Sequence, residues 1–277
     1  MTEKTILITG CSSGIGYTCA LGLKARGWRV FATARKPVDL SRLAGLGLET
    51  LYLDYADANS IDACVKEVSR RTGGKLRALF NNGAYGQPGA VEDLTRSTLE
   101  AQFQANVFGW HQLATSCLAL MRNNGEGRIV QNSSVLGLVA MKWRGAYNAS
   151  KFAIEALSDT LRLELRGTKI RVILIEPGPI TSRFTEHALA AFDRNISSDT
   201  SHYRASYEIQ RKRLGGGRSS RFKLPPEAVL AKLIQALEAP RPHARYYVTF
   251  PTFIMAWCRR LLPQRLMDYV VNRASDQ

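Results

Sequence analysis

Short apolar runs alternate along the chain with longer stretches of helical character. The runs predict β-strands at residues 4–9, 29–34, 49–53, 77–80, 128–132, 169–175 and 245–249. Helices are predicted between them, at about residues 16–26, 60–72, 97–121, 147–166 and 226–239, with a short one inside 37–47. This alternation predicts an α/β fold in which a doubly wound, parallel sheet carries helices on both faces.

The loop between the first strand and the first helix is rich in glycine. Glycines at such a junction permit a tight turn, and the free amides at the helix N-terminus bind a pyrophosphate. A glycine-rich turn alone is a weak indication, and the spacing here is not the commoner G-x-G-x-x-G. The strand before it and the helix after it nevertheless favour a dinucleotide site. We assign to cofactor binding Gly10, Ser12, Ser13, Gly14, Ile15 and Gly16.

The end of the second strand distinguishes the two nicotinamide cofactors. NAD-binding folds usually place an acid there to hold the ribose 2′-hydroxyl. This strand ends with Ala34-Arg35-Lys36, without an acid. A guanidinium binds a 2′-phosphate through charge-assisted hydrogen bonds, whereas a carboxylate repels it. We therefore expect NADP(H), with Arg35 as the main contact and Ser13 beside it. The alternative is that Arg35 is an ordinary surface residue.

Two further strand ends carry polar or small residues. Open α/β sheets bind ligands at the carboxyl ends of their strands. Asp54 follows the strand at 49–53 and is expected to hold the adenine amine. After the strand at 77–80, a turn of small residues that contains Asn81 and Gly83 allows a nicotinamide ribose to approach the backbone. We assign all three residues to cofactor binding.

The pentapeptide Tyr147-Asn148-Ala149-Ser150-Lys151 carries the candidate acid and base. Residues four apart on a helix project into the same space, so the Tyr147 hydroxyl and the Lys151 ammonium are expected to lie together. A free tyrosine has a pKa of about 10, too high for proton transfer near neutrality. A cation roughly 5 Å away, at an effective dielectric of ~20, would stabilise the phenolate by about 3 kcal/mol and lower that pKa by about two units. The alternative is an exposed helix turn that merely happens to hold both residues.

Asn106 lies in the middle of the helix predicted at 97–121. Asparagine inside a helix is mildly unfavourable and calls for a reason. One reason is a local kink that frees its carbonyl to hold a water molecule.

In their order and spacing, these motifs resemble those of the short-chain dehydrogenase/reductase family. The resemblance covers roughly residues 4–250, and one departure is the order Gly83-Ala84, where the family usually has alanine before glycine. The matching motifs are TGCSSGIG at 9–16, Asp54, NNGA at 81–84, Asn106, Ser134, YNASK at 147–151 and PG at 177–178. The ATAR strand end, EPGPI at 176–180 and a C-terminal extension are similar to the retinol and 17β-hydroxysteroid dehydrogenase branch, especially its bacterial NADP-dependent aldehyde and ketone reductases.

The resemblance implies a Rossmann-like sheet of seven strands and a catalytic tetrad of Asn106, Ser134, Tyr147 and Lys151. In carbonyl reduction the nicotinamide delivers hydride, Tyr147 protonates the oxygen, and Ser134, thirteen residues before Tyr147, donates a hydrogen bond to that oxygen. Lys151 lowers the tyrosine pKa and holds the nicotinamide ribose. Tyr147 and Lys151 are both implied to contact the cofactor. Asn106 holds a water that connects Lys151 to solvent. Further cofactor contacts are implied for Pro177, Gly178, Ile180 and Thr181.

The composition limits the class of protein. With 277 residues, 45% hydrophobic and 22% charged, the chain is typical of a globular protein with an ample core. It has no apolar run long enough for a transmembrane helix, and its first residues lack the features of a signal peptide. The five cysteines are scattered and no pair has metal-ligand spacing, so we expect a reduced, cytoplasmic protein without a metal.

The net charge of +15 leaves a second class of function open. Between Arg204 and Lys223 there are seven lysines and arginines and one acid, which is usually just a solvated surface. The alternative to an enzyme is a non-catalytic NADP(H)-binding regulator whose basic surface binds nucleic acid. No helix-turn-helix or interleaved basic and aromatic pattern supports it, so nucleic acid is not expected as a partner.

The C-terminal third suggests how a substrate is enclosed. We expect one cofactor-binding and catalytic domain at residues 1–250, with a substrate lid at about 182–224 whose flexible point is Gly215-Gly216-Gly217, and a helical extension at 251–277. The apolar residues of the extension, such as Trp257, have three interpretations. They pack on their own domain or a partner subunit, wall an apolar pocket, or dock on a membrane surface beside Arg259-Arg260. We expect a lipophilic carbonyl or alcohol as substrate and a homo-oligomer, either a dimer or a tetramer.

Overall fold

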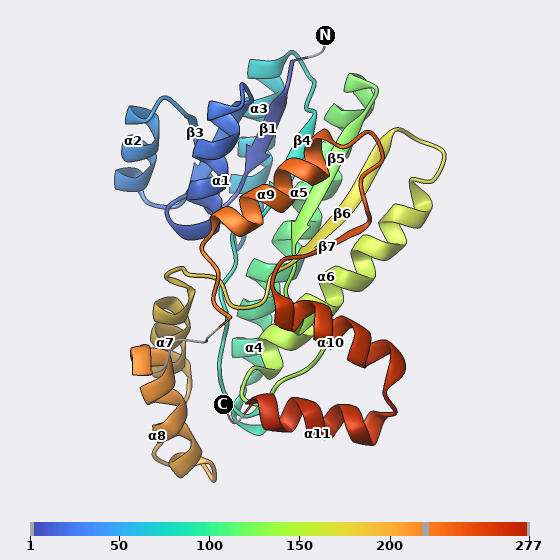
Figure 1. The fold of residues 1–277 in the computed structure, drawn as a ribbon. Coiled ribbons are helices and arrows are strands. Elements are labelled where there is room, and N and C mark those ends of the chain that lie inside the picture. Colours follow the sequence, from blue (N-terminus) through green and yellow to red (C-terminus); the bar gives the residue numbers. More distant parts are fainter. Residues whose placement is uncertain (1–2, 218–221, 276–277) are drawn as a thin grey trace.

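The computed structural model describes residues 3–217 and 222–275 and contains a single parallel sheet (Figure 1). The strand order is β3-β2-β1-β4-β5-β6-β7, so the winding reverses between β1 and β4, which is where open α/β sheets bind ligands. The predicted doubly wound sheet of seven strands is confirmed. The strands are β1 (Thr5–Ile8), β2 (Arg29–Ala34), β3 (Glu49–Tyr52), β4 (Ala78–Asn81), β5 (Gly127–Asn132), β6 (Ile170–Glu176) and β7 (Arg245–Tyr247).

Helices cover both faces of the sheet, as predicted. One face is covered by α1 (Gly14–Ala25), α2 (Pro37–Gly45) and α9 (Glu227–Glu238), and the other by α3 (Ala58–Thr72), α5 (Gly109–Asn124) and α6 (Gly145–Glu164). In β1, Ile6 and Ile8 face the core beneath α1 and α9, whereas Leu7 faces the core beneath α3 and α5. Strands buried on both faces are apolar throughout, which explains the uninterrupted apolar runs of the sequence.

The helical region that precedes β5 is interrupted at its middle. It consists of α4 (Arg96–Phe103), a π-helical turn (Gln104–Phe108) and α5. The kink predicted at Asn106 is therefore confirmed, and its form is a π-helical turn. Such turns are rare and occur frequently at functional sites.

Two helical segments lie beyond the carboxyl end of the sheet (Figure 1). The segment predicted as a lid contains α7 (Phe184–Asn195), α8 (Arg204–Lys212) and a π-helical turn (Arg213–Gly217) that holds the three glycines; residues 218–221 lie outside the described residues. The C-terminal extension forms α10 (Phe250–Leu261) and α11 (Gln264–Ser275). Two short 3₁₀ turns, Val91–Asp93 and Val135–Gly137, complete the elements. Within residues 3–217 and 222–275, no helix is long and apolar enough to cross a membrane.

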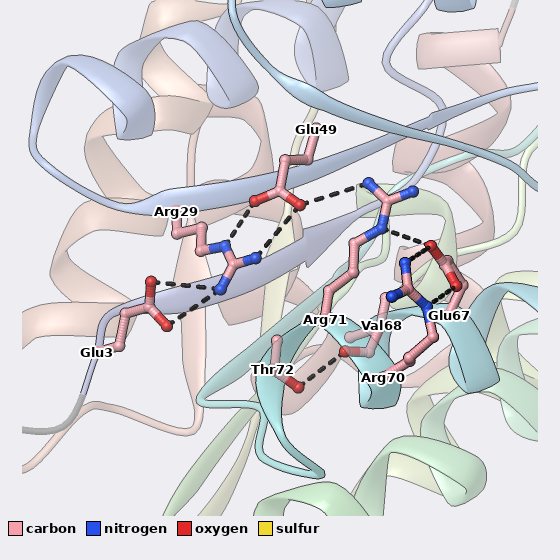
Figure 2. Close-up of polar contacts among 8 residues, drawn as sticks. All are labelled: Glu3, Arg29, Glu49, Glu67, Val68, Arg70, Arg71 and Thr72. Carbon is pink, nitrogen blue, oxygen red and sulfur yellow. Dashed lines mark hydrogen bonds and ion pairs between the residues drawn. The ribbon is translucent and has the colours of Figure 1, made fainter.

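An ion-pair network closes the opposite, amino end of the sheet (Figure 2). Arg29 Nε is 2.5 Å from Glu49 Oε1, and Arg71, near the end of α3, bridges Glu49 Oε2 at 3.4 Å and Glu67 Oε1 at 2.7 Å. Glu3 adds a contact to Arg29 at 3.3 Å. These side chains are partly exposed, so each pair contributes little to the free energy of unfolding. The network ties α3 to the starts of β2 and β3, at the end of the sheet away from the candidate site.

Candidate active site

The glycine-rich turn forms a cradle against the turn that follows β4. Gly10 and Gly14 have φ of +68° and +57°, in the left-handed region that favours glycine. A Cβ at Gly10 would lie 2.6 Å from Gly83 Cα, and one at Gly16 would lie 2.3 Å from Gly10 O. Ser13, the N-cap of α1, makes no side-chain cap hydrogen bond. The first amides of α1 thus lack a cap from Ser13, which is the arrangement that binds a phosphate.

The order Gly83-Ala84 fits this close approach. A Cβ at Gly83 would lie 3.3 Å from both the Gly10 nitrogen and the Tyr55 ring, which is tighter than most contacts. The Gly83 carbonyl accepts a hydrogen bond from Trp110 Nε1 at 2.8 Å. Ala84 packs against the core beneath α3 and α5. The inverted order therefore places the residue without a side chain where the two turns meet.

Arg35 and Asp54 meet at the carboxyl ends of β2 and β3. Arg35 Nη1 is 3.8 Å from Asp54 Oδ2, and the Arg35 side chain is 72% exposed. A single long ion pair at the surface is weak, so the guanidinium remains accessible to a phosphate. Helix α7 and the residue before it bring His187 and Arg183 to this corner. Burial lowers the pKa of His187 on α7, and the positive charges of Arg183, Arg35 and Lys36 lower it further.

Ser134 lies just beyond β5, with its hydroxyl oxygen partly engaged. Its Oγ accepts a hydrogen bond from the Leu136 amide at 3.1 Å and so caps the 3₁₀ turn at 135–137. Because the oxygen accepts from the backbone, the hydroxyl proton is free to be donated elsewhere. Val135, the next residue, donates its amide to the Pro177 carbonyl at 2.8 Å and thereby ties this turn to the end of β6.

Lys151 is buried beneath the site and held by two groups. Its Nζ donates to the Asn132 carbonyl at 2.8 Å and lies 4.2 Å from the centroid of the Trp110 ring. The same Nζ is 5.6 Å from the centroid of the Tyr147 ring, so the spacing of four residues brings the two side chains together as predicted. Burial lowers the pKa of Lys151 to about 7, and the nearby Glu155 carboxylate opposes that shift.

The predicted effect of Lys151 on Tyr147 is wrong in this structure. The pKa of Tyr147 is raised above its ordinary value because the phenol is buried, and a hydrogen bond with Ser134 opposes the shift only in part. The prediction assumed a fully charged lysine and ignored the cost of burying the phenolate. A pKa of about 7 leaves Lys151 only partly charged at neutral pH. Tyr147 is therefore a neutral phenol that can donate its proton.

Asn106 joins three segments around the site. Its Nδ2 donates to the Tyr85 carbonyl at 2.9 Å and to Ser150 Oγ at 3.2 Å, and its Oδ1 accepts from the Tyr85 amide at 3.3 Å. Ser150 Oγ in turn donates to the Tyr147 carbonyl at 2.8 Å. Asn106 thus fixes the loop after β4 against the first turn of α6. That its carbonyl holds a water remains a prediction.

The two asparagines after β4 have different surroundings. Asn81 is fully buried; its Oδ1 accepts from Tyr55 and its Nδ2 donates to Gln131, so its side chain serves the interior of the sheet. Asn82 Nδ2 donates to the Thr9 carbonyl at 2.9 Å, directly behind the glycine turn. Sequence reasoning missed Thr9, Asn82, Trp110 and Asn132. Local signals existed for Thr9, which begins the TGCSSGIG motif, and for Asn82, which belongs to the NNGA motif.

The segment predicted as a lid begins and ends at one point beside β6. The Thr181 amide donates to the Leu224 carbonyl at 2.9 Å, and the Leu224 amide donates to the Pro179 carbonyl at 3.1 Å. A Cβ at Gly178 would lie 2.2 Å from Thr249 Oγ1, so glycine is required where α10 begins. The predicted cofactor residues from Pro177 to Thr181 therefore form the base of the lid.

Helix α7 covers Tyr147. The Phe184 ring meets the Tyr147 ring edge to face, with centroids 5.3 Å apart, and a Cβ at Gly86 would lie 2.8 Å from the same phenylalanine. Ser182 also reaches the phosphate turn, since its Cβ would lie 3.0 Å from a Cβ at Gly14. The lid thus contacts both the glycine cradle and the candidate acid.

Helix α8 docks the lid onto residues 87–94. Tyr207 accepts a hydrogen bond from the Ala90 amide at 2.8 Å and donates to Asp93 Oδ2. Its ring also contacts Trp143, whose φ of 63° is unusual for a residue other than glycine. Trp143 lies four residues before Tyr147 and was not predicted as part of the site. The contacts enclose an apolar cluster formed by Ala90, Leu94, Ala146, Phe192, Ile196 and Tyr207.

The comparisons with known proteins agree with this geometry. A family model described as short chain dehydrogenase matches residues 4–191. The chain is 42% identical over 271 residues to the uncharacterized oxidoreductase YbbO of Escherichia coli, covering 98% of this chain and 94% of that protein. It is 31% identical over 264 residues to 17-beta-hydroxysteroid dehydrogenase type 1 of Homo sapiens, covering 90% and 78%. The crystal structure of a short-chain dehydrogenase from Streptomyces avermitilis superposes with a TM-score of 0.78 at 26% identity, covering 100% and 98%.

Members of this family bind NAD(P)(H) and act on small carbonyl or alcohol substrates, which suits a glycine cradle lying beside a half-buried tyrosine and a buried lysine. The chain therefore belongs to the short-chain dehydrogenase family and is an oxidoreductase.

Proposed function

We propose that this protein is an NADP(H)-dependent enzyme that interconverts a carbonyl and an alcohol on a lipophilic substrate. The observation that carries the proposal is the convergence of Ser134, Tyr147 and Lys151 at the carboxyl end of β5. Beside them lies the cradle formed by Gly10 and Gly83. A Cβ on Gly10 would clash with the Gly83 backbone, and one on Gly83 would be crowded by Gly10. A cradle of this shape fits a dinucleotide, which, when bound, supplies or accepts the hydride.

Each residue has a distinct role in the proposal. Tyr147 is a neutral phenol before the reaction, since burial raises its pKa. It donates its proton to the carbonyl oxygen during reduction, and the nearby Lys151 ammonium stabilises the phenolate that this leaves. Ser134, whose oxygen already accepts from the Leu136 amide, donates a hydrogen bond to the carbonyl oxygen, where negative charge develops. Lys151 carries the adjacent positive charge and reaches the ribose side of the site. Asn106 positions Tyr147 through Ser150.

The preference for the phosphorylated cofactor rests on the corner around Arg35. The strand end that would hold an acid for NAD has Ala34, and the only acid paired with Arg35 among the described residues is Asp54, at 3.8 Å. Lys36 and, from the segment predicted as a lid, Arg183 add positive charge there, whereas His187 is neutral at neutral pH because its pKa is lowered. Charge-assisted hydrogen bonds to a 2′-phosphate would compensate this local excess of cations.

The lipophilic substrate is supported by the surroundings of Tyr147. Phe184 lies against it, and the cluster between the lid and α6 is apolar. One relative is named as a 17-beta-hydroxysteroid dehydrogenase, and a steroid is largely hydrocarbon. We also propose a homo-oligomer, because members of the family are often oligomeric. Light scattering of the purified protein measures its mass directly.

The experiment is a turnover assay that follows NADPH absorbance with a series of straight-chain aldehydes from propanal to dodecanal. Each buried methylene contributes about 0.8 kcal/mol, so kcat/KM should rise by up to about fourfold per added carbon until the pocket is full. A flat profile, or a preference for small hydroxylated sugars, would contradict the lipophilic substrate. Absence of turnover with every aldehyde and ketone tested, and of alcohol oxidation with NADP⁺, would contradict the enzyme itself.

A further inference from the structure

The outward side of α10 carries large apolar residues that the proposed reaction does not use. Helical geometry, at about 100° per residue, places them on one stripe, opposite the buried Thr252 and Ala256. Single exposed apolar residues are ordinary, but a contiguous stripe of them marks an interaction site. The stripe consists of Phe250, Phe253, Ile254, Trp257 and Leu261, whose exposed fractions are 63, 44, 41, 59 and 69%.

Helix α11 adds to this apolar surface. Its Leu266 and Tyr269 are 53% and 64% exposed and lie three residues apart, hence on one side of the helix. Its other side is anchored, since Met267 is buried and Ser275 Oγ accepts from the Lys142 amide at 3.3 Å. Figure 1 shows that α10 and α11 are consecutive helices at one end of the molecule. None of these exposed side chains has a described contact with Tyr147, so the structure does not support the interpretation that they wall its pocket.

A cationic cavity adjoins the stripe. It has a volume of about 410 Å³ and lies between α6, β7 and α10, where Arg162, Arg259 and Arg260 line it together with Arg245 and a single acid, Asp159. Arg245 is already paired with three carboxylates, but Arg259 and Arg260 have no acid as partner among the described residues' ion pairs. Arg260 follows Phe253 by seven residues, so it borders the apolar stripe on the side of the cavity.

The charge of this surface favours an anionic occupant over a second copy of the chain. In a twofold dimer, the same patch of both copies would meet. That would bring together the arginines of α10 and α11, which are Arg259, Arg260, Arg265 and Arg273, with only Asp268 to offset them. The net charge of +15 on the whole chain also favours an anionic surface as the partner of this patch.

We propose that α10 and α11 dock this protein on the surface of an anionic lipid bilayer. The stripe of α10, with Phe253 and Trp257 at its centre, enters the interface between headgroups and acyl chains. Arg259 and Arg260 bind headgroup phosphates at the mouth of the cavity. Aromatic residues and arginines in this combination are typical of helices that lie in the plane of a membrane surface.

The experiment uses the full chain and vesicles of phosphatidylcholine, either pure or with about 30% phosphatidylglycerol. Sedimentation of the vesicles gives the partition coefficient, and tryptophan emission reports insertion. Trp28 and Trp110 are already buried and Trp143 packs against Tyr203 and Tyr207, so a blue shift on addition of vesicles is expected to come mainly from Trp257. It should be largely lost in Trp257→Phe.

Paired variants separate the two contributions. Phe253→Ser with Trp257→Ser should weaken binding to anionic vesicles by at least about tenfold. Arg259→Gln with Arg260→Gln should weaken it by about fivefold per arginine and should reduce the preference for anionic over neutral vesicles by the same factor. Ile209→Ser on α8, where the native side chain is 66% exposed, is the matched control and should bind like the wild type. NADPH affinity, measured on every variant, confirms that each one folds.

Three results would overturn the proposal. The first is that the wild type does not sediment with anionic vesicles at low salt. The second is that the stripe variant, Phe253→Ser with Trp257→Ser, binds them as tightly as the Ile209→Ser control. The third is that, without lipid, light scattering shows the stripe variant at half the mass of the wild type, which would make this surface a subunit interface.

Discussion

Replacing Arg245 by methionine should strongly destabilise the fold, because Arg245 holds together three carboxylates from α6 and β6. Its Nη1 is 2.6 Å from Glu176 Oε1, its Nη2 is 2.6 Å from Asp159 Oδ2, and it also pairs with Glu155. The side chains of Glu155 and Glu176 are only 9% and 0% exposed. Methionine leaves both without their cation, and removing one partner of a buried ion pair costs about 3–5 kcal/mol.

The loss should depend on pH. Burial, together with the charge of Glu155, raises the pKa of Glu176 to about 8, while Arg245 opposes the shift. Without Arg245 that pKa rises further. A carboxyl whose pKa is raised in the folded state makes a contribution to the free energy of unfolding that is fully present below its unfolded pKa. That contribution is lost as pH rises through the folded pKa. The substitution should therefore cost more at pH 9 than at pH 6, by up to about 1.4 kcal/mol, because at pH 9 only the first unit of a rise above pH 8 counts.

Urea unfolding, followed by the emission of the buried Trp28 and Trp110, measures both effects. The matched control is Arg26→Met, since Arg26 pairs with Glu238 Oε2 at 2.7 Å but its side chain is 46% exposed. Its loss of unfolding free energy should be several times smaller and should change little between the two pH values. If Arg245→Met behaved like Arg26→Met at both pH values, the account of a buried charge cluster would be refuted.

Three further predictions concern the site. Ala34→Asp combined with Arg35→Ala should invert a preference for NADPH over NADH, because each charge-assisted contact is worth about 1.5–3 kcal/mol; equal kcat/KM for both cofactors in the wild type would contradict it. Phe184→Ala should lower kcat/KM for decanal by about tenfold but leave propanal nearly unchanged, and an equal loss for both would exclude a role in binding the alkyl chain. Since the pKa of Lys151 is lowered to about 7, its ammonium is lost as pH rises through that value. kcat/KM for reduction should fall above about pH 7, and a flat profile from pH 6 to 9 would contradict the role of the charge.

The sheet and the central motifs were predictable because local geometry determines them. The glycine-rich turn needs residues that tolerate positive φ, as Gly10 and Gly14 show. The spacing of Tyr147 and Lys151 follows from the pitch of one helix. Even the interruption at Asn106 could be predicted, because an asparagine in a helix interior conflicts with local propensity.

What the sequence did not predict depends on contacts between distant segments. Trp110 and Asn132 hold Lys151 from separate elements, and neither stands out in the pattern of the chain. The sign of the Tyr147 pKa shift was wrong for the same reason, since burial arises only when the lid and α6 come together. The docking of α8 through Tyr207 and Asp93 spans 114 residues of sequence and has no local signal.

Turnover of Tyr147→Phe tests the central claim most directly, namely that Tyr147 is the proton donor. The substitution removes only the hydroxyl and keeps the ring that packs against Phe184. kcat for aldehyde reduction should fall by about 100-fold or more, the usual contribution of general acid catalysis, while the Kd for NADPH stays within about twofold of the wild type. If the variant instead keeps more than about a tenth of the wild-type kcat, another group donates the proton and the account is contradicted.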